Sequence, residues 1–381
     1  MNSSALPSPP AAAFEPAPHP PPPPEPPRAQ RRPIARVWLL VGPLLVLALV
    51  AMVVSALVDV DYILLAPGSA TPVQPLVEVK NGKTFDDKGQ LMYTTVGVGQ
   101  PSAIEAIYGW LHPDIDLFPR QDINGDKSNE ETRRESLQMM DTSKLVATKV
   151  ALEELGYTVN VSGTGVRVMN VSPGLPVEGK LHPGDVITAL DGDPATLDDD
   201  LRRLIEERNP GDVVTLRVER ADSDEVEDVE VELAPRPTDP DVPFIGIVIE
   251  TRDLEFDFPV DVRIDSGKVG GPSAGLAFTL AILDRLTPGS LTGGKRVAIT
   301  GAINPDGSVG PVGGVAQKTV AAIEADATVF LVPTDEFDVA TEVAGDDLDV
   351  IRVDSLDDAL KALDGLGGNA LDLGTPGKSD D

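Results

Sequence analysis

The alternation of apolar and charged positions divides the chain into segments of different character. Residues 1–27 are dominated by Pro and Ala and contain too little apolar bulk to fold, so we expect a disordered tail over residues 1–36. Residues 37–58 then run for 22 positions without a charge. As a helix this run is about 33 Å long, which is enough for a hydrocarbon core of about 30 Å. The sequence therefore predicts a transmembrane helix over residues 37–58.

The charges on either side of this run predict its orientation. Four arginines precede it, whereas Asp59 and Asp61 follow it and the next basic residue is Lys80. Cytoplasmic flanks carry the excess of Lys and Arg, so the N-terminus is expected in the cytoplasm and the remainder outside. A cleavable signal peptide with a site at residues 54–56 is the rival interpretation. The run exceeds the usual 7–15 residues of a signal core, which favours the anchor.

Composition restricts the partners and the chemistry. Sixty-two acidic residues against 31 basic ones give a net charge of −31, which argues against nucleic-acid binding. The chain has no cysteine, so neither a cysteine nucleophile nor a disulfide is available. The stability of an exported domain must then come from its apolar cores, and about 320 residues after the anchor can supply two of them.

Strand-like and helix-like patterns mix after the anchor. Residues 62–65, 73–79 and 92–98 read as strands, whereas residues 102–111 and 143–155 read as helices, with Ser102 as an N-cap. We assign residues 60–158 to an extracytoplasmic α/β segment. Asp122, Asn124 and Asp126 lie near Gly125, but the glycine is misplaced for a calcium loop, and no metal or cofactor is expected.

Strand-like Gly165-Val-Arg-Val is followed by the turn SPGLPVEGKLHPGD, the strand VITAL and an amphipathic helix over residues 197–207. With this order of elements, residues 159–236 resemble a PDZ domain. The resemblance implies capture of an extended polypeptide by strand addition. It also implies that backbone amides at the PDZ carboxylate loop receive a terminal carboxylate, and the residues expected there are Gly163, Thr164, Gly165 and Val166. A PDZ fold that serves only as a spacer is the alternative.

A serine and a lysine offer hydrolytic chemistry without histidine. The three histidines lie in a proline-rich tail or directly before prolines, so none stands in a run that looks catalytic. Ser273 in GGPSAG is predicted to begin a helix, where free N–H groups can hold a developing oxyanion. Lys318 ends GGVAQK, and burial would lower its pKa toward roughly 7–8, where the neutral amine can act as a base. Thr300 could hold that amine by a hydrogen bond.

These motifs carry a second resemblance. GGPSAG, ITGAI, NPDG and GPVGGVAQK look like the proteolytic domain of Lon-type serine peptidases, over roughly residues 240–365. The resemblance implies that Ser273 is the nucleophile, Lys318 the general base and Thr300 the threonine near that lysine. The backbone at Gly271, Ser273 and Ala274 is the expected oxyanion site. Many relatives carry Asp in place of Gly270 and Glu in place of Ala302, which puts the gating of the site in doubt.

An energy source is not evident in the sequence. A P-loop requires a glycine, four residues and then Gly-Lys-Ser/Thr, and no segment of the 381 residues fits. The order of anchor, PDZ and Lon-type domain resembles the membrane-anchored, ATP-independent Lon-like proteases of Gram-positive bacteria. That resemblance implies that the early strands pack with the protease and that the PDZ domain is an insertion. Residues 366–381 are expected to be a disordered tail.

The sequence thus predicts an α+β protein with an N-terminal transmembrane helix, a PDZ domain and a Lon-type proteolytic domain. Its expected function is that of an ATP-independent serine endopeptidase that hydrolyses exported or misfolded polypeptides, with the PDZ domain recruiting them. The alternative is a non-catalytic membrane adaptor that retains a protease fold. The expected partners are polypeptide substrates and a membrane, and the oligomeric state, including a homo-oligomer, stays open.

Overall fold

The computed structural model describes residues 34–85, 88–125, 127–221, 223 and 225–373. The chain divides into two compact units, of which the first ends at Leu57 and the second begins at Val58. The described part of the first unit is one helix, α1 (Ile34–Leu57), so the segment predicted over residues 37–58 is helical up to Leu57. No helix in the described part of the chain is both long and apolar enough to cross a membrane. The predicted N-terminal tail lies outside the described residues up to position 33.

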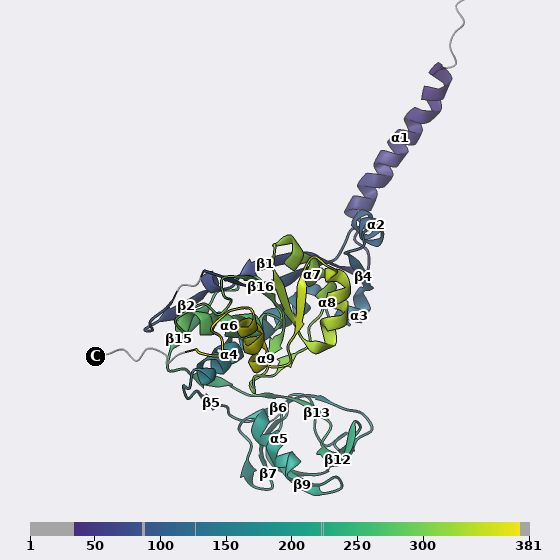
Figure 1. Cartoon of the computed structure of the whole chain (residues 1–381). Helices are drawn as coiled ribbons and strands as arrows, with labels where there is room; N and C mark the ends of the chain where they lie inside the picture. Colours follow the sequence, from purple (N-terminus) through teal and green to yellow (C-terminus); the bar gives the residue numbers. More distant parts are fainter. Residues whose placement is uncertain (1–33, 86–87, 126, 222, 224, 374–381) are drawn as a thin grey trace, which may run out of the picture. The chain divides into compact units, whose positions relative to one another are not determined.

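A mixed six-stranded sheet forms the centre of the second unit (Figure 1), with the strand order β20-β19-β16-β3-β1-β4. The strands are β1 (Tyr62–Pro72), β3 (Gln90–Gly99), β4 (Asp116–Pro119), β16 (Arg296–Ile299), β19 (Val329–Val332) and β20 (Asp349–Arg352). β16 pairs in parallel with both β3 and β19, whereas β1 is antiparallel to β3 and β4. Strands from the early segment and from the predicted proteolytic domain therefore share one sheet.

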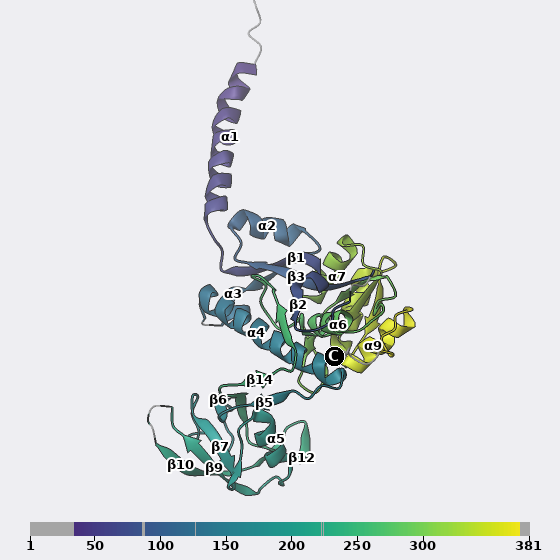
Figure 2. The ribbon, with the colours of Figure 1, turned by 90° about the vertical axis from the view of Figure 1, so that its left-hand side faces the viewer.

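Alternate residues of β16 belong to two separate cores. Val297 and Ile299 pack with α4 (Asn129–Glu154), α6 (Gly275–Leu286) and α9 (Leu356–Gly365). Ala298 packs with α7 (Val315–Glu324) and α8 (Phe337–Ala344). Successive side chains of a strand point to opposite faces, so the sheet has helices on both sides (Figure 2).

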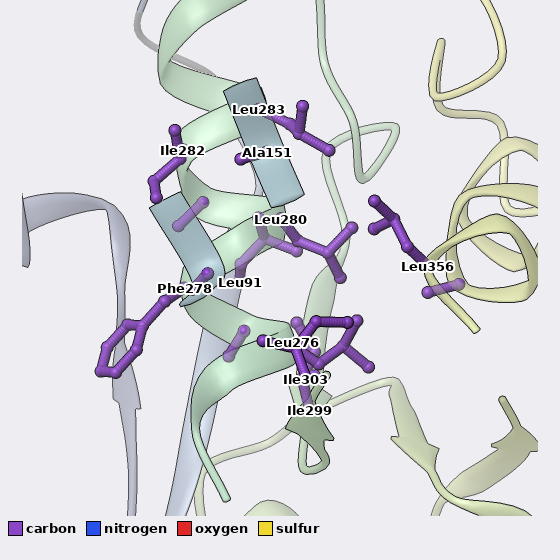
Figure 3. Packing of buried hydrophobic residues seen from close by; sticks show 14 of the residues in the cluster. Leu91, Ala151, Leu276, Phe278, Leu280, Ile282, Leu283, Ile299, Ile303 and Leu356 are labelled. Carbon is purple, nitrogen blue, oxygen red and sulfur yellow. The ribbon is translucent and has the colours of Figure 1, made fainter. Parts of the chain in front are cut away.

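Helix α6 lies inside the larger core. All its residues except Arg285 are buried, as expected for a helix that is apolar on every side. Figure 3 shows Phe278 and Leu280 of α6 among Leu91 of β3, Ala151 of α4 and Leu356 of α9. The turn that precedes α6 is therefore attached to one of the most firmly packed elements of the fold.

A second sheet forms the PDZ module, with the order β10-β9-β7-β6-β13. Its strands are β6 (Val166–Val171), β7 (Val186–Leu190), β9 (Val213–Glu219), β10 (Val226–Glu232) and β13 (Ile247–Thr251), with the short β8 (Asp193–Pro194) beside β7. Helix α5 (Asp198–Glu206) buries Leu201, Leu204 and Ile205 in the core of this module. β13 lies beyond the predicted end of the PDZ domain at residue 236, yet it pairs along the length of β6.

Short paired strands complete the second unit. They are β2 (Val77–Lys80) with β15 (Asp261–Ile264), β5 (Asn160–Ser162) with β14 (Glu255–Asp257), β11 (Ala234–Arg236) with β12 (Asp239–Phe244), and β17 (Ala302–Ile303) with β18 (Val309–Gly310). Two further helices are α2 (Ala103–Leu111) and α3 (Arg120–Asn124). β5 precedes the PDZ sheet and β14 follows it, so their pairing places the entry and exit of the module side by side. The module is thus an insertion between α4 and the strand β15.

Candidate active site and peptide groove

The predicted nucleophile lies in the turn before α6. Ser273 is half-buried, and the helix begins at Gly275 with Ala274 as its N-cap, two residues later than predicted. Gly271 has a φ of +88°, which a side chain would strain. The chain thus reverses sharply at Gly271 and presents Ser273 at the N-terminal end of a buried helix.

Helix α4 holds this turn from outside the predicted motifs. The Gly271 amide donates to the Ser136 carbonyl at 2.7 Å, and the Ser143 hydroxyl donates to the Pro272 carbonyl at 3.1 Å. A Cβ at Gly270 would stand 2.4 Å from the Ser136 hydroxyl, so a side chain there would require that hydroxyl to move. The sequence contained no clear signal for these α4 contacts.

Lys318 lies one turn into α7. The helix begins after Gly314, which adopts a left-handed conformation with φ +68°. Lys318 is 3% exposed, and its burial lowers its pKa from 10.5 to about 8. The Glu336 carboxylate opposes this shift. At neutral pH roughly a tenth of such amines are already unprotonated, in line with the range expected from the sequence.

Thr300 connects the lysine to the serine-bearing turn. The Lys318 Nζ donates to the Thr300 Oγ1 at 3.1 Å, and that hydroxyl donates to the Ser273 carbonyl at 3.4 Å. The Gly301 amide donates to the same carbonyl at 2.9 Å. Thr300 is fully buried directly after β16. The fold thus brings Ser273, Thr300 and Lys318 into one hydrogen-bonded group. Within this group, Thr300 contacts Ser273 through the main-chain carbonyl of the serine and not through its hydroxyl.

The three amides expected to form an oxyanion site differ in availability. The Gly271 amide is already bonded to Ser136, so it does not donate to a substrate in this conformation. The amides of Ser273 and Ala274 have no partner among the described residues. Because they precede the first turn of α6, they retain the donor capacity that a tetrahedral oxyanion requires. The predicted site is therefore reduced to two amides.

Glu336 is a charged neighbour that sequence reasoning missed. Its Oε1 accepts from the Val312 amide at 2.9 Å, and its buried Oε2 has no partner in the described part of the chain. It follows β19, and the carboxyl ends of neighbouring parallel strands meet at one edge of the sheet. The position after a buried strand in a parallel sheet was the signal that could have identified it.

The residues predicted to form the carboxylate loop of the PDZ module make hydrogen bonds within the protein. The Thr164 amide donates to the Arg252 carbonyl at 2.9 Å, and the Gly165 amide donates to the Thr196 carbonyl at 3.2 Å. Val166 is fully buried in β6, between β7 and β13. A Cβ at Gly163 would stand 2.4 Å from Thr251, so this loop is closed by packing. Two of the four predicted amides are therefore already engaged within the module.

An open groove lies instead along β13. A cavity of about 320 Å³ separates this strand from α5, and its lining comprises Arg202, Ile205, Glu206, Arg236, Pro243, Phe244, Ile245, Ile247, Val248 and Ile249. β13 is the last strand in its sheet, so one of its edges lacks a strand neighbour among the described residues. Gly246, with φ +84°, turns the chain into β13. The signal in the sequence was Phe-Ile-Gly-Ile before an alternating strand, but it lay outside the predicted domain.

Among the described residues, no group of three or more His, Asp or Glu side chains could hold a metal ion. His112 and His182 lie near Asp114 and Asp185, 3.6 and 3.8 Å away. Neither histidine contacts the Ser273 turn by a hydrogen bond. The chemistry available at the site is therefore that of a hydroxyl, an amine and two amides.

Comparison with known proteins finds two domain models that match different parts of the chain. Residues 153–233 match the PDZ domain model, and residues 252–364 match the model of the Lon protease (S16) C-terminal proteolytic domain. The second boundary follows β13 by one residue, in agreement with its place in the PDZ sheet.

Individual relatives match the same proteolytic part. The Lon protease of Campylobacter concisus is 32% identical over 120 residues, which are 30% of this chain and 14% of that protein. The Lon protease of Elusimicrobium minutum is 36% identical over 121 residues, again 30% and 14%. The chain therefore spans about a seventh of the length of these curated relatives. The PDZ domain of the SdrC-like protein of Listeria innocua is 28% identical, over 22% of this chain and 92% of that one, with a TM-score of 0.21. The chain combines a PDZ domain with a proteolytic domain of the Lon type.

Proposed function

We propose that the protein is a serine endopeptidase in which Ser273 is the nucleophile and Lys318 the general base. The observation that carries the proposal is the burial of Lys318, which lowers its pKa to about 8 while Thr300 holds its amine. A buried lysine without a hydrogen-bonded carboxylate lowers the stability of a fold, and groups with such perturbed pKa values cluster at functional sites. The match of residues 252–364 to a proteolytic domain supports that use.

Peptide-bond hydrolysis follows from these groups in two stages. The neutral Lys318 amine takes the proton of the Ser273 hydroxyl while the oxygen attacks the substrate carbonyl carbon. The amides of Ser273 and Ala274 bind the oxyanion of the tetrahedral intermediate. The Lys318 ammonium then protonates the leaving amine, which departs and leaves an acyl ester on Ser273. In the second stage Lys318 takes a proton from water while the hydroxide attacks the ester carbonyl. The bond to the Ser273 oxygen then breaks, the carboxyl product leaves, and the Lys318 ammonium returns its proton to the serine.

Substrate recruitment is assigned to the groove between α5 and β13. An extended polypeptide can pair with the open edge of β13, while apolar side chains enter the groove beside Ile205 and Ile249. The strand β13 leads directly into residue 252, where the proteolytic domain begins. Capture there raises the local concentration of substrate, and neither step requires ATP.

Attachment to a membrane through residues 37–58 is a separate proposal that rests on the uncharged run and the preceding arginines. Helix α2 supports it. The Ala103 amide donates to the Val58 carbonyl at 2.9 Å, so the start of α2 is bonded to the first residue of the second unit. Ile107, Tyr108, Trp110 and Leu111 of α2 are 59–81% exposed, and aromatic side chains favour the membrane–water interface. A reporter that is active only outside the cytoplasm should be active when fused after Asp61 and inactive when fused before Arg28.

The catalytic proposal is tested with an unfolded polypeptide, the full chain and two variants. Ser273→Ala removes the nucleophile, and Lys318→Arg keeps a cation that cannot deprotonate in this range. Both should abolish cleavage, with or without ATP and magnesium. Activity of the wild type that disappears in both variants supports the proposal. No cleavage by the wild type, together with retained peptide binding, would favour a non-catalytic adaptor.

A further inference from the structure

A cavity of about 440 Å³ lies on the α4 side of the Ser273 turn. Its lining comprises Ile63, Val98, Gly99, Gln100, Asn124, Asn129, Thr132, Arg133, Ser136, Leu137, Lys268 and Gly270. We call it the Arg133–Lys268 cavity. None of these residues belongs to the predicted catalytic group or to the PDZ groove.

The cavity borders the reacting centre. Gly270 lines it and is three residues from Ser273, a path of at most about 11 Å between Cα atoms. Ser136 also lines it and accepts a hydrogen bond from Gly271 through its carbonyl. A polypeptide whose carbonyl lies at Ser273 therefore has a neighbouring side chain within reach of this cavity.

The charges of the cavity are unlike those of the rest of the molecule. Arg133 and Lys268 form no ion pair with any described residue, and the lining contains no carboxylate. The chain has twice as many acidic as basic residues, and most of its arginines outside the tail pair with carboxylates, as Arg220 and Arg252 do. Two cations left together beside the nucleophile turn form a locally positive site.

The remaining lining shows which groups are free to bind. The Asn124 side-chain amide donates to the Asn129 Oδ1 at 2.8 Å, and the Asn129 amide donates to the Gln100 Oε1 at 3.0 Å. These amides are thus engaged with one another. The Thr132 hydroxyl is buried and has no partner in the described part of the chain. Ile63, Val98 and Leu137 add an apolar surface, so the cavity suits a group with an apolar stem and an anionic end.

We propose that the Arg133–Lys268 cavity is a substrate subsite that receives a carboxylate close to the scissile bond. The inference rests on the proposed peptidase function and adds a substrate class to it. The carboxylate can belong to an acidic side chain or to the end of the substrate chain. In either case Arg133 and Lys268 provide the charge, and the Thr132 hydroxyl can donate a hydrogen bond.

The test uses short fluorogenic peptides with amidated ends, in which Glu, Gln or Lys occupies each position next to one cleavable bond. At one position the wild type should cleave the Glu peptide with about tenfold higher kcat/KM than its Gln counterpart. The variant Arg133→Glu/Lys268→Glu should lose this preference and favour Lys. Arg134→Glu is the matched control, because Arg134 is the next residue on α4, is exposed and does not line the cavity. A second set with free carboxyl ends distinguishes a terminal carboxylate from a side chain.

A binding measurement separates this inference from the peptidase proposal. Fluorescence anisotropy with the full-length Ser273→Ala chain gives the affinity of the same Glu and Gln peptides without turnover. If the wild type cleaves nothing but the Glu preference in binding depends on Arg133 and Lys268, the peptidase proposal fails and the subsite stands. Equal kcat/KM and equal affinity for Glu and Gln peptides, or a preference that survives the double charge reversal, would overturn the subsite.

Discussion

The PDZ module and the proteolytic domain each bury a charged side chain, but the two side chains differ in their hydrogen-bond partners. In the PDZ module Asp185 is 2% exposed and is fully satisfied, since it accepts from the Arg220 guanidinium and from the amides of His182 and Ala221. In the proteolytic domain Lys318 is 3% exposed and donates only to a threonine hydroxyl in the described structure. Asp185 thus has a cation and two amide donors beside it, whereas burial disfavours the charged form of Lys318 and lowers its pKa. Lys318 lacks a hydrogen-bonded counter-charge, and this difference from Asp185 is why we propose it as the reactive group.

The largest effect expected from this contrast is on catalysis. Ser273→Ala and Lys318→Ala should each lower kcat by at least about a thousandfold, and the double variant should lose little more, because the two residues act as one unit. Cleavage of a fluorogenic peptide by purified full-length protein gives the rates. Arg134→Glu serves as the surface control. Substantial turnover by either single variant would refute the assignment of the dyad.

Removal of the Asp185 carboxylate and removal of the Lys318 amine should change stability in opposite directions. Asp185→Ala should lower the free energy of unfolding by about 3 kcal/mol, because it breaks a buried pair and leaves two amides without a partner. Lys318→Met should raise it at pH 7 by up to about 3 kcal/mol, since the folded state no longer buries an ammonium. Denaturant unfolding of the second unit measures both.

The lowered pKa of Lys318 also predicts how the free energy of unfolding depends on pH. The pKa of Lys318 is about 8 in the folded protein and 10.5 once the side chain is exposed by unfolding, so the unfolded chain binds more protons between these values. Wild-type stability attributable to this residue should rise from pH 8 to pH 10.5, and the gain from Lys318→Met should disappear over the same window. A gain that is constant with pH would mean that the substitution acts through packing instead.

A smaller effect is expected at the PDZ groove. Ile249→Asp places a charge where β13 faces α5, and should raise KM for long unfolded substrates several-fold while short peptides are cut as before. Val226→Asp on β10 is the matched control, because Val226 is 57% exposed and lies outside the groove. Equal losses on long and short substrates, in a variant that unfolds like the wild type, would indicate that the module acts on the dyad directly.

The sequence predicted the catalytic region better than the groove, for a physical reason. Ser273, Thr300 and Lys318 stand in short motifs whose local turns place them, and α6 was recognisable by its apolar residues. The PDZ groove depends on β13, which pairs with β6 after an excursion of more than seventy residues. Periodicity identifies a strand but not its partner, so the boundary was placed at 236 and the carboxylate loop at residues 163–166.

Helix α4 shows the same limit within the proteolytic domain. The helix predicted over residues 143–155 begins at Asn129 in the structure. Its polar first half carries no apolar stripe, so periodicity did not reveal it. Ser128 and Glu131 form a capping box there, and Ser-x-x-Glu is a signal that could have found it. No local pattern could have indicated that Ser136 and Ser143 of this helix hold the Ser273 turn, since that contact depends on tertiary packing.

The central claim is that Lys318 is a buried amine whose neutral form activates Ser273. The most direct measurement is the pH dependence of kcat/KM for one uncharged fluorogenic peptide between pH 6 and pH 10, with full-length wild type. The account predicts that kcat/KM rises about tenfold per pH unit at the acidic end and levels off above an apparent pKa of about 8. A profile that is flat across this range, or one that rises toward the ordinary lysine pKa near 10.4 without a plateau, would contradict it.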